Sequence, residues 1–244
     1  MNRLVTMALM DIRILRTLLF YSLLFTQVVR GQSPVTNQRL FDTIPFIPEH
    51  YPQRIAQFEK EPLATGRIIF LGNSITEMGR WDKLIGDSTV VNRGIGGDIT
   101  FGVLKRMDDI IRRKPSKLFL LIGINDIGKD IPDLVIADNI RKIIRRVQNE
   151  SPSTVIYLES ILPVNPDIRG FPQHYDKNQH VVSTNALLKN LAMETKITLI
   201  DTYSFFEDGE GKLKKEYTIE GLHINPGGYQ AWIKFLKDGK YLEQ

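Results

Sequence analysis

Three side chains of this sequence have the types that acyl-transfer chemistry requires. Ser74 ends the run "IIFLGNS" (68–74), in which an apolar stretch stops abruptly at a small polar triplet. His223 is one of only four histidines, and Glu220 lies three residues before it in "EGLH". A carboxylate beside an imidazole orients a general base and stabilises its cationic form, and such a base activates a serine hydroxyl. The three residues therefore predict nucleophilic attack on a carbonyl carbon.

Each of these residues also has an ordinary alternative. A serine that follows a strand is often the N-cap of a helix, and a backbone carbonyl could orient His223 in place of Glu220. A metal site at His223 is disfavoured, because no second histidine or cysteine lies at ligand spacing. Whether Ser74 and His223 are catalytic or have these ordinary roles therefore depends on the residues that surround them.

Two further segments supply groups that could bind a developing negative charge. Gly94, Gly96 and Gly97 crowd one loop, whose backbone N–H groups can approach a ligand without interference from a Cβ atom. This loop is not a dinucleotide fingerprint, because Ile99 stands where the third glycine belongs, and it is not a Walker loop, because no Gly-Lys-Ser/Thr follows. Asn125 ends the most apolar stretch, where a neutral amide donor suits an oxyanion, although asparagines also cap turns there.

The hydrophobic pattern predicts the elements that bring these residues together. Apolar, β-branched runs predict strands and amphipathic runs predict helices. The expected strands are 66–72, 88–97, 117–126, 153–160 and 197–201, and the expected helices are 51–62, 104–114, 131–151, 180–196 and 225–239. This alternation predicts one α/β domain with a parallel sheet of about five strands. Ligands bind beyond the carboxyl ends of such strands, so Ser74, Gly97 and Asn125 are expected at one edge of the sheet.

The first 31 residues have the parts of a secretory signal. Arg13 and Arg16 precede the apolar stretch "TLLFYSLLF" (17–25), Gly31 suits a cleavage position, and Met10 would serve equally well as the start. An uncleaved anchor is the alternative, although the stretch is short for a membrane span. We expect a signal peptide (1–31), a Pro-rich lead-in segment (32–65) and a catalytic domain (66–244). The protein is then periplasmic or secreted, without stable membrane insertion after signal removal.

The composition argues against some binding partners and covalent modifications. The net charge is +4, but without residues 1–31 the chain has 28 basic and 27 acidic residues. No cluster of Lys and Arg interleaved with aromatic residues remains, so nucleic acid is not an expected partner. The chain has no cysteine, which excludes disulfides and a lipid-modified cysteine. The sequence does not indicate an oligomeric state.

Four sequence blocks in this order resemble those of the SGNH (GDSL-type) ester hydrolases. They are "GNSIT" (72–76), "NRGIGGDIT" (92–100), "GIND" (123–126) and "EGLHINPGGY" (220–229). The resemblance runs from about residue 66 to the C-terminus. It looks closest to the branch of platelet-activating-factor acetylhydrolase-like enzymes and bacterial carbohydrate O-acetylesterases. It implies a three-layer α/β/α sandwich with a flavodoxin-like, five-stranded parallel sheet.

The resemblance also implies roles for single residues. Ser74 would be the nucleophile and His223 the base, and the oxyanion would bind the backbone N–H groups of Ser74 and Gly97 and the side-chain amide of Asn125. No metal or organic cofactor would be needed. The chain departs from the family at Asn73, where an Asp is usual, and at Glu220, which replaces the Asp expected before the histidine. Whether Glu220 or a backbone carbonyl orients His223 therefore stays open.

These observations predict an exported serine ester hydrolase. It would remove a small acyl group, acetyl by resemblance, from a glycan or another acyl ester through a Ser-His-Glu triad. The alternatives are a lipid esterase or thioesterase of the same fold, and a binding module that has lost turnover. The longest irregular stretch, 162–180, offers Arg169, Phe171 and His174 as candidate substrate contacts, or else is a solvated connector.

Overall fold

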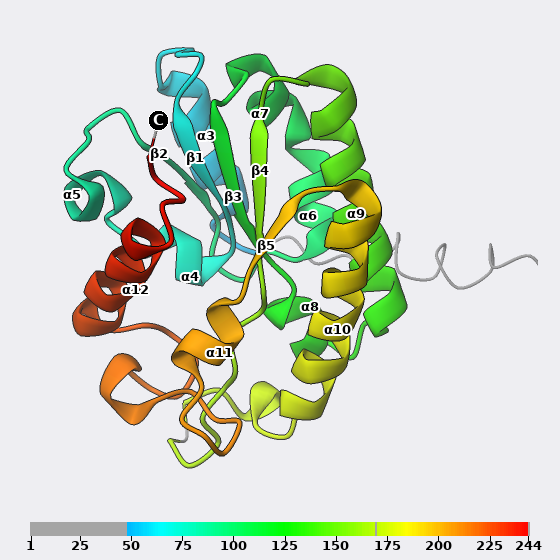
Figure 1. The fold of residues 1–244 in the computed structure, drawn as a ribbon, viewed down its shortest axis with the longest axis vertical. Coiled ribbons are helices and arrows are strands. Elements are labelled where there is room, and N and C mark those ends of the chain that lie inside the picture. The colour runs from blue at the N-terminus through cyan, green and yellow to red at the C-terminus, as the bar shows by residue number, and fades with distance from the viewer. Residues whose placement is uncertain (1–47, 169, 244) are drawn as a thin grey trace, which may run out of the picture. The chain divides into compact units, whose positions relative to one another are not determined.

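The protein is built around one parallel sheet of five strands (Figure 1). A computed structural model describes residues 48–168 and 170–243; the predicted signal peptide, residues 32–47 of the lead-in segment and Arg169 lie outside these residues. The strand order is β2-β1-β3-β4-β5, which is the flavodoxin-like order. The strands are β1 (Ile68–Gly72), β2 (Val91–Gly94), β3 (Lys117–Leu121), β4 (Val155–Glu159) and β5 (Thr198–Ile200). The predicted sheet is confirmed.

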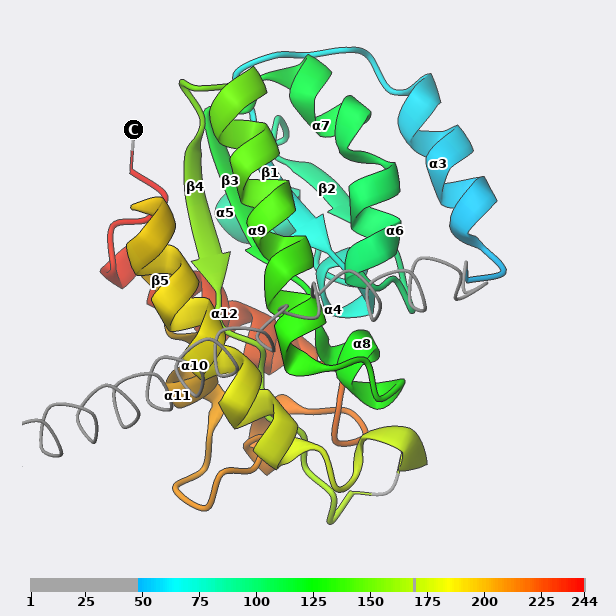
Figure 2. The same ribbon diagram turned by 90° about the vertical axis from the view of Figure 1, so that its right-hand side faces the viewer.

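Helices cover both faces of the sheet. They are α3 (Tyr51–Lys60), α4 (Ser74–Glu77), α5 (Trp81–Ile85), α6 (Thr100–Lys105), α7 (Met107–Arg113), α8 (Ile124–Gly128), α9 (Asp133–Glu150), α10 (Asn178–Thr195), α11 (Thr202–Phe206) and α12 (Pro226–Asp238). Two 3₁₀ turns span Pro172–His174 and Lys215–Tyr217. Figures 1 and 2 show α5 and α12 on one face of the sheet and α6, α7, α9 and α10 on the other, which confirms the three-layer α/β/α sandwich. None of the described helices is both long and apolar enough to cross a bilayer.

Aromatic side chains fill the layer between the sheet and helices α5 and α12. The Phe70 ring of β1 stacks on Trp81 of α5 with 4.1 Å between ring centroids, and on Phe119 of β3 at 4.6 Å. Trp232 of α12 meets Trp81 edge-on at 5.2 Å. Each such pair contributes about 0.5–1.5 kcal/mol beyond the area it buries. This layer fixes α12, and with it the loop before α12 that carries His223.

The tail of β3 differs from the predicted strand, which was expected to run to residue 126. The strand ends at Leu121, and Gly123 has a φ of 130°, which only glycine adopts readily. The chain then enters α8, so Asn125 lies in the first turn of a short helix and not at a strand end.

Helix α12 begins where predicted: Asn225 caps it by accepting from the Gly228 N–H at 2.9 Å.

The segment before β1 is attached to the domain by α3. Tyr51 and Phe58 of α3 form a buried cluster with Ile95, which follows β2. Arg93, 1% exposed, lies against the Phe58 ring and forms ion pairs with Glu61 and Asp109. A charge buried so deeply needs such partners, because desolvation alone would be costly.

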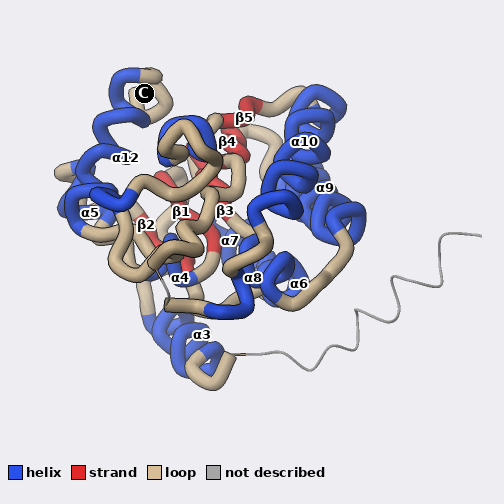
Figure 3. The backbone as a smooth tube through the Cα atoms, turned by 90° about the horizontal axis from the view of Figure 1, so that it is seen from below, coloured by secondary structure: helices blue, strands red, loops and turns tan. Residues whose placement is uncertain are grey.

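Figure 3 shows the domain from the side of the sheet where the strands end, and α4, α8 and α3 lie near this edge.

A buried carboxyl group makes the stability of this fold depend on pH. Burial raises the pKa of Glu159, at the end of β4, from 4.5 to about 8, and the indole N–H of Trp232 opposes this rise by donating to its Oε1. Between these two pH values the folded protein holds a proton that the unfolded chain releases. The contribution of Glu159 to the free energy of unfolding therefore falls as the pH rises from about 4.5 to 8.

We predict that Glu159→Gln reduces this pH dependence, because a neutral amide of similar volume has no proton to lose. Thermal unfolding followed by circular dichroism between pH 5 and 8.5 measures the effect. The melting temperature of the wild type should fall more over this range than that of the variant. Glu59→Gln, which changes an exposed carboxylate of α3, is the matched control and should follow the wild type. Parallel pH profiles for all three proteins would contradict the prediction.

Candidate active site

Ser74 is the first residue of α4, directly after β1. It is not the N-cap of that helix: Asn73 is, since its Oδ1 accepts from the Ile75 N–H at 3.0 Å. Asn73 thus keeps the capping role that a carboxylate would have at this position. A Cβ atom on Gly72 would lie 2.2 Å from the Leu121 carbonyl oxygen and from Thr76 Oγ1, so the close approach of chain segments here requires glycine. The Ser74 hydroxyl is left for another partner.

That partner is His223. Its Nε2 lies 2.9 Å from Ser74 Oγ, and its Nδ1 lies 2.7 Å from Glu220 Oε1. The same carboxylate oxygen accepts from the His223 backbone N–H at 2.8 Å, so two bonds fix the carboxylate relative to the ring. The side chains of His223 and Glu220 are 14% and 24% exposed. The structure therefore brings the three predicted residues into one hydrogen-bonded line, with a carboxylate at Nδ1.

The loop that carries Glu220 and His223 is held from both sides. Gly221 has a φ of 93°, and a Cβ atom there would lie 2.4 Å from the Asn165 carbonyl oxygen. Thr218 Oγ1 accepts from the Gly221 N–H and donates to the His223 carbonyl oxygen, both at 2.8 Å. The Asn165 N–H, in the tail of β4, donates to the Gly221 carbonyl oxygen at 2.8 Å. The tail of β4 thus supports the histidine loop and supplies no reacting group.

Three donors converge beside Ser74. The backbone N–H groups of Ser74 and Gly97 have no hydrogen-bond acceptor within the described part of the chain. Asn125 Nδ2 donates one hydrogen to the Asp98 carbonyl oxygen at 3.0 Å, and the second hydrogen of its amide stays available. Ser74, Gly97, Asn125 and His223 all line one cavity of about 430 Å³. Such fixed donors can stabilise an oxyanion that forms next to the hydroxyl.

The rest of the cavity wall comes from segments after β3 and β4. Phe171 meets the His223 ring edge-on with 5.1 Å between centroids, and His174 lies deeper in the wall, so two predicted contact residues do line the cavity. Four lining residues had not been predicted: Gly128, Lys129, Gln173 and Leu222. Gly128 and Lys129 lie three and four residues after Asn125, the spacing of one helical turn, so assignment of 124–128 as a helix would have indicated them.

Burial shifts the pKa values of two side chains near the cavity, His174 and Asp126. Burial, with the nearby His223 as a smaller cause, lowers the pKa of His174 to about 4, so its ring is neutral near pH 7. Burial raises the pKa of Asp126 to about 7. Thr100 partly opposes this rise by donating its N–H and its hydroxyl to Asp126, the hydroxyl at 2.6 Å. These bonds tie α8 to the start of α6 and thereby place Asn125.

Within residues 48–168 and 170–243, no three His, Asp or Glu side chains come together as a candidate metal site. The cofactor-free mechanism implied by the resemblance stays a prediction.

Comparison with known proteins identifies the class. The GDSL-like Lipase/Acylhydrolase family model matches residues 70–231, so the chain belongs to this family. The human platelet-activating factor acetylhydrolase IB subunit alpha2 is 27% identical over 187 residues, which are 74% of this chain and 76% of that protein. A solved structure from Streptococcus pneumoniae, named for platelet activating factor, is 35% identical, with a TM-score of 0.68 over 77% of this chain and 91% of that one. The acetylxylan esterase Axe2 from Geobacillus stearothermophilus shares the fold, at 19% identity and a TM-score of 0.57 over 73% of this chain and 96% of that one. The predicted family is confirmed, and the protein is a carboxylic ester hydrolase.

We predict that Glu220→Gln lowers kcat on the order of 10²-fold or more, because an amide cannot stabilise the imidazolium that forms at His223. Glu220→Asp should keep part of the activity, since it keeps the charge. Steady-state kinetics with a chromogenic acetyl ester measures both. Glu216→Gln, which changes an exposed carboxylate four residues away, serves as the control. Wild-type kcat in Glu220→Gln would mean that Ser74 and His223 act as a dyad.

Proposed function

We propose that this protein is an exported serine esterase that removes a small acyl group, acetyl in the first place, from a glycan. The observation that carries the proposal is the line from Glu220 through His223 to Ser74, with contacts of 2.7 and 2.9 Å, beside a cavity with three oxyanion donors. Nucleophile, base, acid and donors thus meet at one point, as acyl transfer requires.

The mechanism follows from this geometry. His223 Nε2 takes the proton of the Ser74 hydroxyl while Oγ attacks the ester carbonyl carbon, and Glu220 stabilises the resulting imidazolium. The oxyanion accepts hydrogen bonds from the N–H groups of Ser74 and Gly97 and from the Asn125 amide. When the carbonyl re-forms, the C–O bond to the alcohol breaks and His223 gives the alcohol its proton. Water, deprotonated by His223, then attacks the acyl group and releases it from Ser74 as a carboxylic acid.

Two observations support a small acyl group. The cavity of about 430 Å³ must hold the acyl group together with the reacting carbonyl, and Phe171, His174 and Leu222 are among the residues that line it. The human relative is named an acetylhydrolase. The glycan and the export rest on the resemblance and on residues 1–31, and both stay proposals.

A series of chromogenic esters with increasing acyl length tests the proposal. We predict that kcat/KM is highest for acetyl and falls steeply beyond short acyl groups, because longer chains meet the cavity wall. Ser74→Ala is the control variant, since it removes one oxygen and should reduce hydrolysis to background without changing the melting temperature much. A preference for long acyl chains would favour the lipid esterase. Absence of hydrolysis with every ester, including O-acetylated glycans, would favour the binding module.

His174 is the best candidate for a polar contact with the substrate. It is 4% exposed and lines the cavity, and neither ring nitrogen has a hydrogen bond of normal geometry within the described residues. A Cβ atom on Gly128 would lie 2.6 Å from His174 Nε2, so the ring depends on this glycine for its position. A buried imidazole whose ring nitrogens lack hydrogen bonds of normal geometry is costly, and a polar substrate atom could supply one.

We predict that His174→Phe, which keeps an aromatic ring but loses both nitrogens, raises KM roughly 10-fold, the scale of one net hydrogen bond. Because the pKa of His174 is about 4, this difference should stay constant from pH 6 to 9. His180→Phe, at an exposed histidine of α10, is the matched control. Equal KM values for wild type and His174→Phe with all acetyl esters would exclude the contact.

A further inference from the structure

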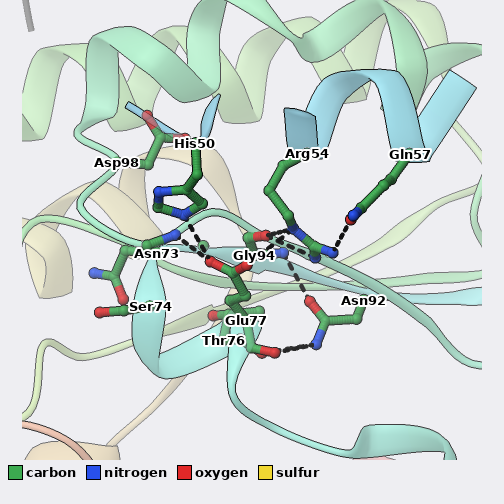
Figure 4. A network of polar contacts seen from close by, with 12 residues as sticks. His50, Arg54, Gln57, Asn73, Ser74, Thr76, Glu77, Asn92, Gly94 and Asp98 are labelled. Carbon is green, nitrogen blue, oxygen red and sulfur yellow. Dashed lines mark hydrogen bonds and ion pairs between the residues drawn. The ribbon is translucent and has the colours of Figure 1, made fainter. Parts of the chain in front are cut away.

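Glu77 lies one helical turn after Ser74, yet its carboxylate does not line the cavity. Figure 4 shows it between α3 and the loop that follows β2. Its Oε2 accepts from the Gly96 N–H, and its Oε1 lies 3.0 Å from Arg54 Nε. His50 Nε2 lies 3.2 Å from Oε2. The carboxylate is thus bound at once to the loop and to two side chains of the segment before β1.

The end of β2, where this loop begins, packs against the end of α4. A Cβ atom on Gly94 would lie 2.1 Å from the Glu77 backbone nitrogen, so the two backbones are in direct contact. Asn92 Nδ2 donates to the carbonyl oxygens of Thr76 and Glu77 at 2.9 and 3.0 Å. Arg54 donates to the Gly94 carbonyl oxygen at 3.1 Å (Figure 4). Arg54 therefore holds both the last residue of β2, where the loop begins, and the carboxylate that binds the loop.

The residues held in this way sit next to the oxyanion donors. Gly96, whose N–H donates to Glu77, is followed by Gly97, which lines the cavity beside Ser74 and Asn125. The next carbonyl, that of Asp98, accepts from the Asn125 amide at 3.0 Å. A shift of this loop would therefore displace the Gly97 N–H. It would also move the Asp98 carbonyl oxygen that orients the Asn125 amide. Displacements of about 1 Å in such groups can cost on the order of 10²-fold in rate.

We propose that Glu77, held by Arg54 and His50, is a positioning residue for the oxyanion-binding loop. It acts through Gly96 and does not touch the substrate. The inference rests on the proposed function, since it assumes that Gly97 and Asn125 bind the oxyanion. If Glu77 has this role, then α3, which carries Arg54, also contributes to catalysis. This helix precedes residues 70–231, which match the family model.

The test compares kcat and KM of Glu77→Ala, Glu77→Gln and Arg54→Ala on an acetyl ester. Each preparation is normalised to its active sites by titration with a fluorophosphonate. Glu77→Ala should lower kcat on the order of 10-fold to 10²-fold with little change in KM, because oxyanion donors act mainly in the transition state. Glu77→Gln should recover most of the activity, since its amide oxygen can still accept from Gly96. Arg54→Ala leaves that bond in place and should have a smaller effect.

A double-mutant cycle with Asn125→Ala separates positioning from general damage. Asn125→Ala alone should lower kcat on the order of 10²-fold to 10³-fold. In that background Glu77→Ala should cost less than in the wild type, because the aligned amide is already absent. Glu59→Ala, at an exposed residue of α3, is the control.

Additive losses, or wild-type kcat in Glu77→Ala, would overturn the positioning role while leaving the proposed function intact. Loss of active-site titre in Glu77→Ala without a change in kcat per active site would also overturn it. If Asn125→Ala itself has no effect on kcat, the proposed oxyanion site fails, and the role of Glu77 fails with it.

Discussion

A buried guanidinium group holds together the backbone on which the site is built. Arg106, 6% exposed, donates to the carbonyl oxygens of Gly72 at 2.9 Å and Arg93 at 2.7 Å, and to the Asp98 carboxylate at 3.0 Å. Gly72 comes two residues before Ser74, and Asp98 directly follows Gly97. One side chain therefore fixes the tails of β1 and β2 and the oxyanion-binding loop to each other. Removing one member of such a buried pair costs about 3–5 kcal/mol, because the other charge stays buried.

The second half of the site comes from the far end of the chain, and packing brings it into place. Ser74 and His223 are 149 residues apart, and their contact depends on where α12 lies. The Tyr229 hydroxyl of α12 donates to the Ile75 carbonyl oxygen at 2.5 Å, directly beside Ser74. Trp81 and Trp232 join α5 to α12 in the aromatic layer. The geometry of the serine and histidine is thus a property of the folded sheet and its covering helices.

Local patterns in the sequence were sufficient for the fold and indicated candidate reacting residues, whose roles the family resemblance implied. The apolar runs predicted all five strands, and Asn225-Pro226 predicted the start of α12. Ser74, His223 and Glu220 could be paired because carboxylate and imidazole are three residues apart, and strand tails converge at one edge of a parallel sheet. Asn125 was expected at a strand end, but the positive φ of Gly123 turns the chain into α8 first.

Long-range contacts could not be predicted in this way. In the sequence, Arg106 and Glu77 resemble ordinary charged residues of amphipathic helices, and only the folded chain shows that one is buried and the other reaches Gly96. The helix predicted over 51–62 before β1 is present as α3, but its packing on the domain through Phe58 and Arg93 could not be predicted. Such contacts join residues that are far apart in the sequence, so the spacing of apolar residues within one helix or strand does not predict them.

The central claim is that Ser74 forms a covalent acyl intermediate at this site. Rapid mixing of the enzyme with a chromogenic acetyl ester, acid quenching within one turnover and intact-protein mass spectrometry test it most directly. With deacylation as the slower step, we expect a burst of one alcohol per active site and one added acetyl group, mapped by peptide sequencing to Ser74. An acetyl group on a residue other than Ser74 would contradict it.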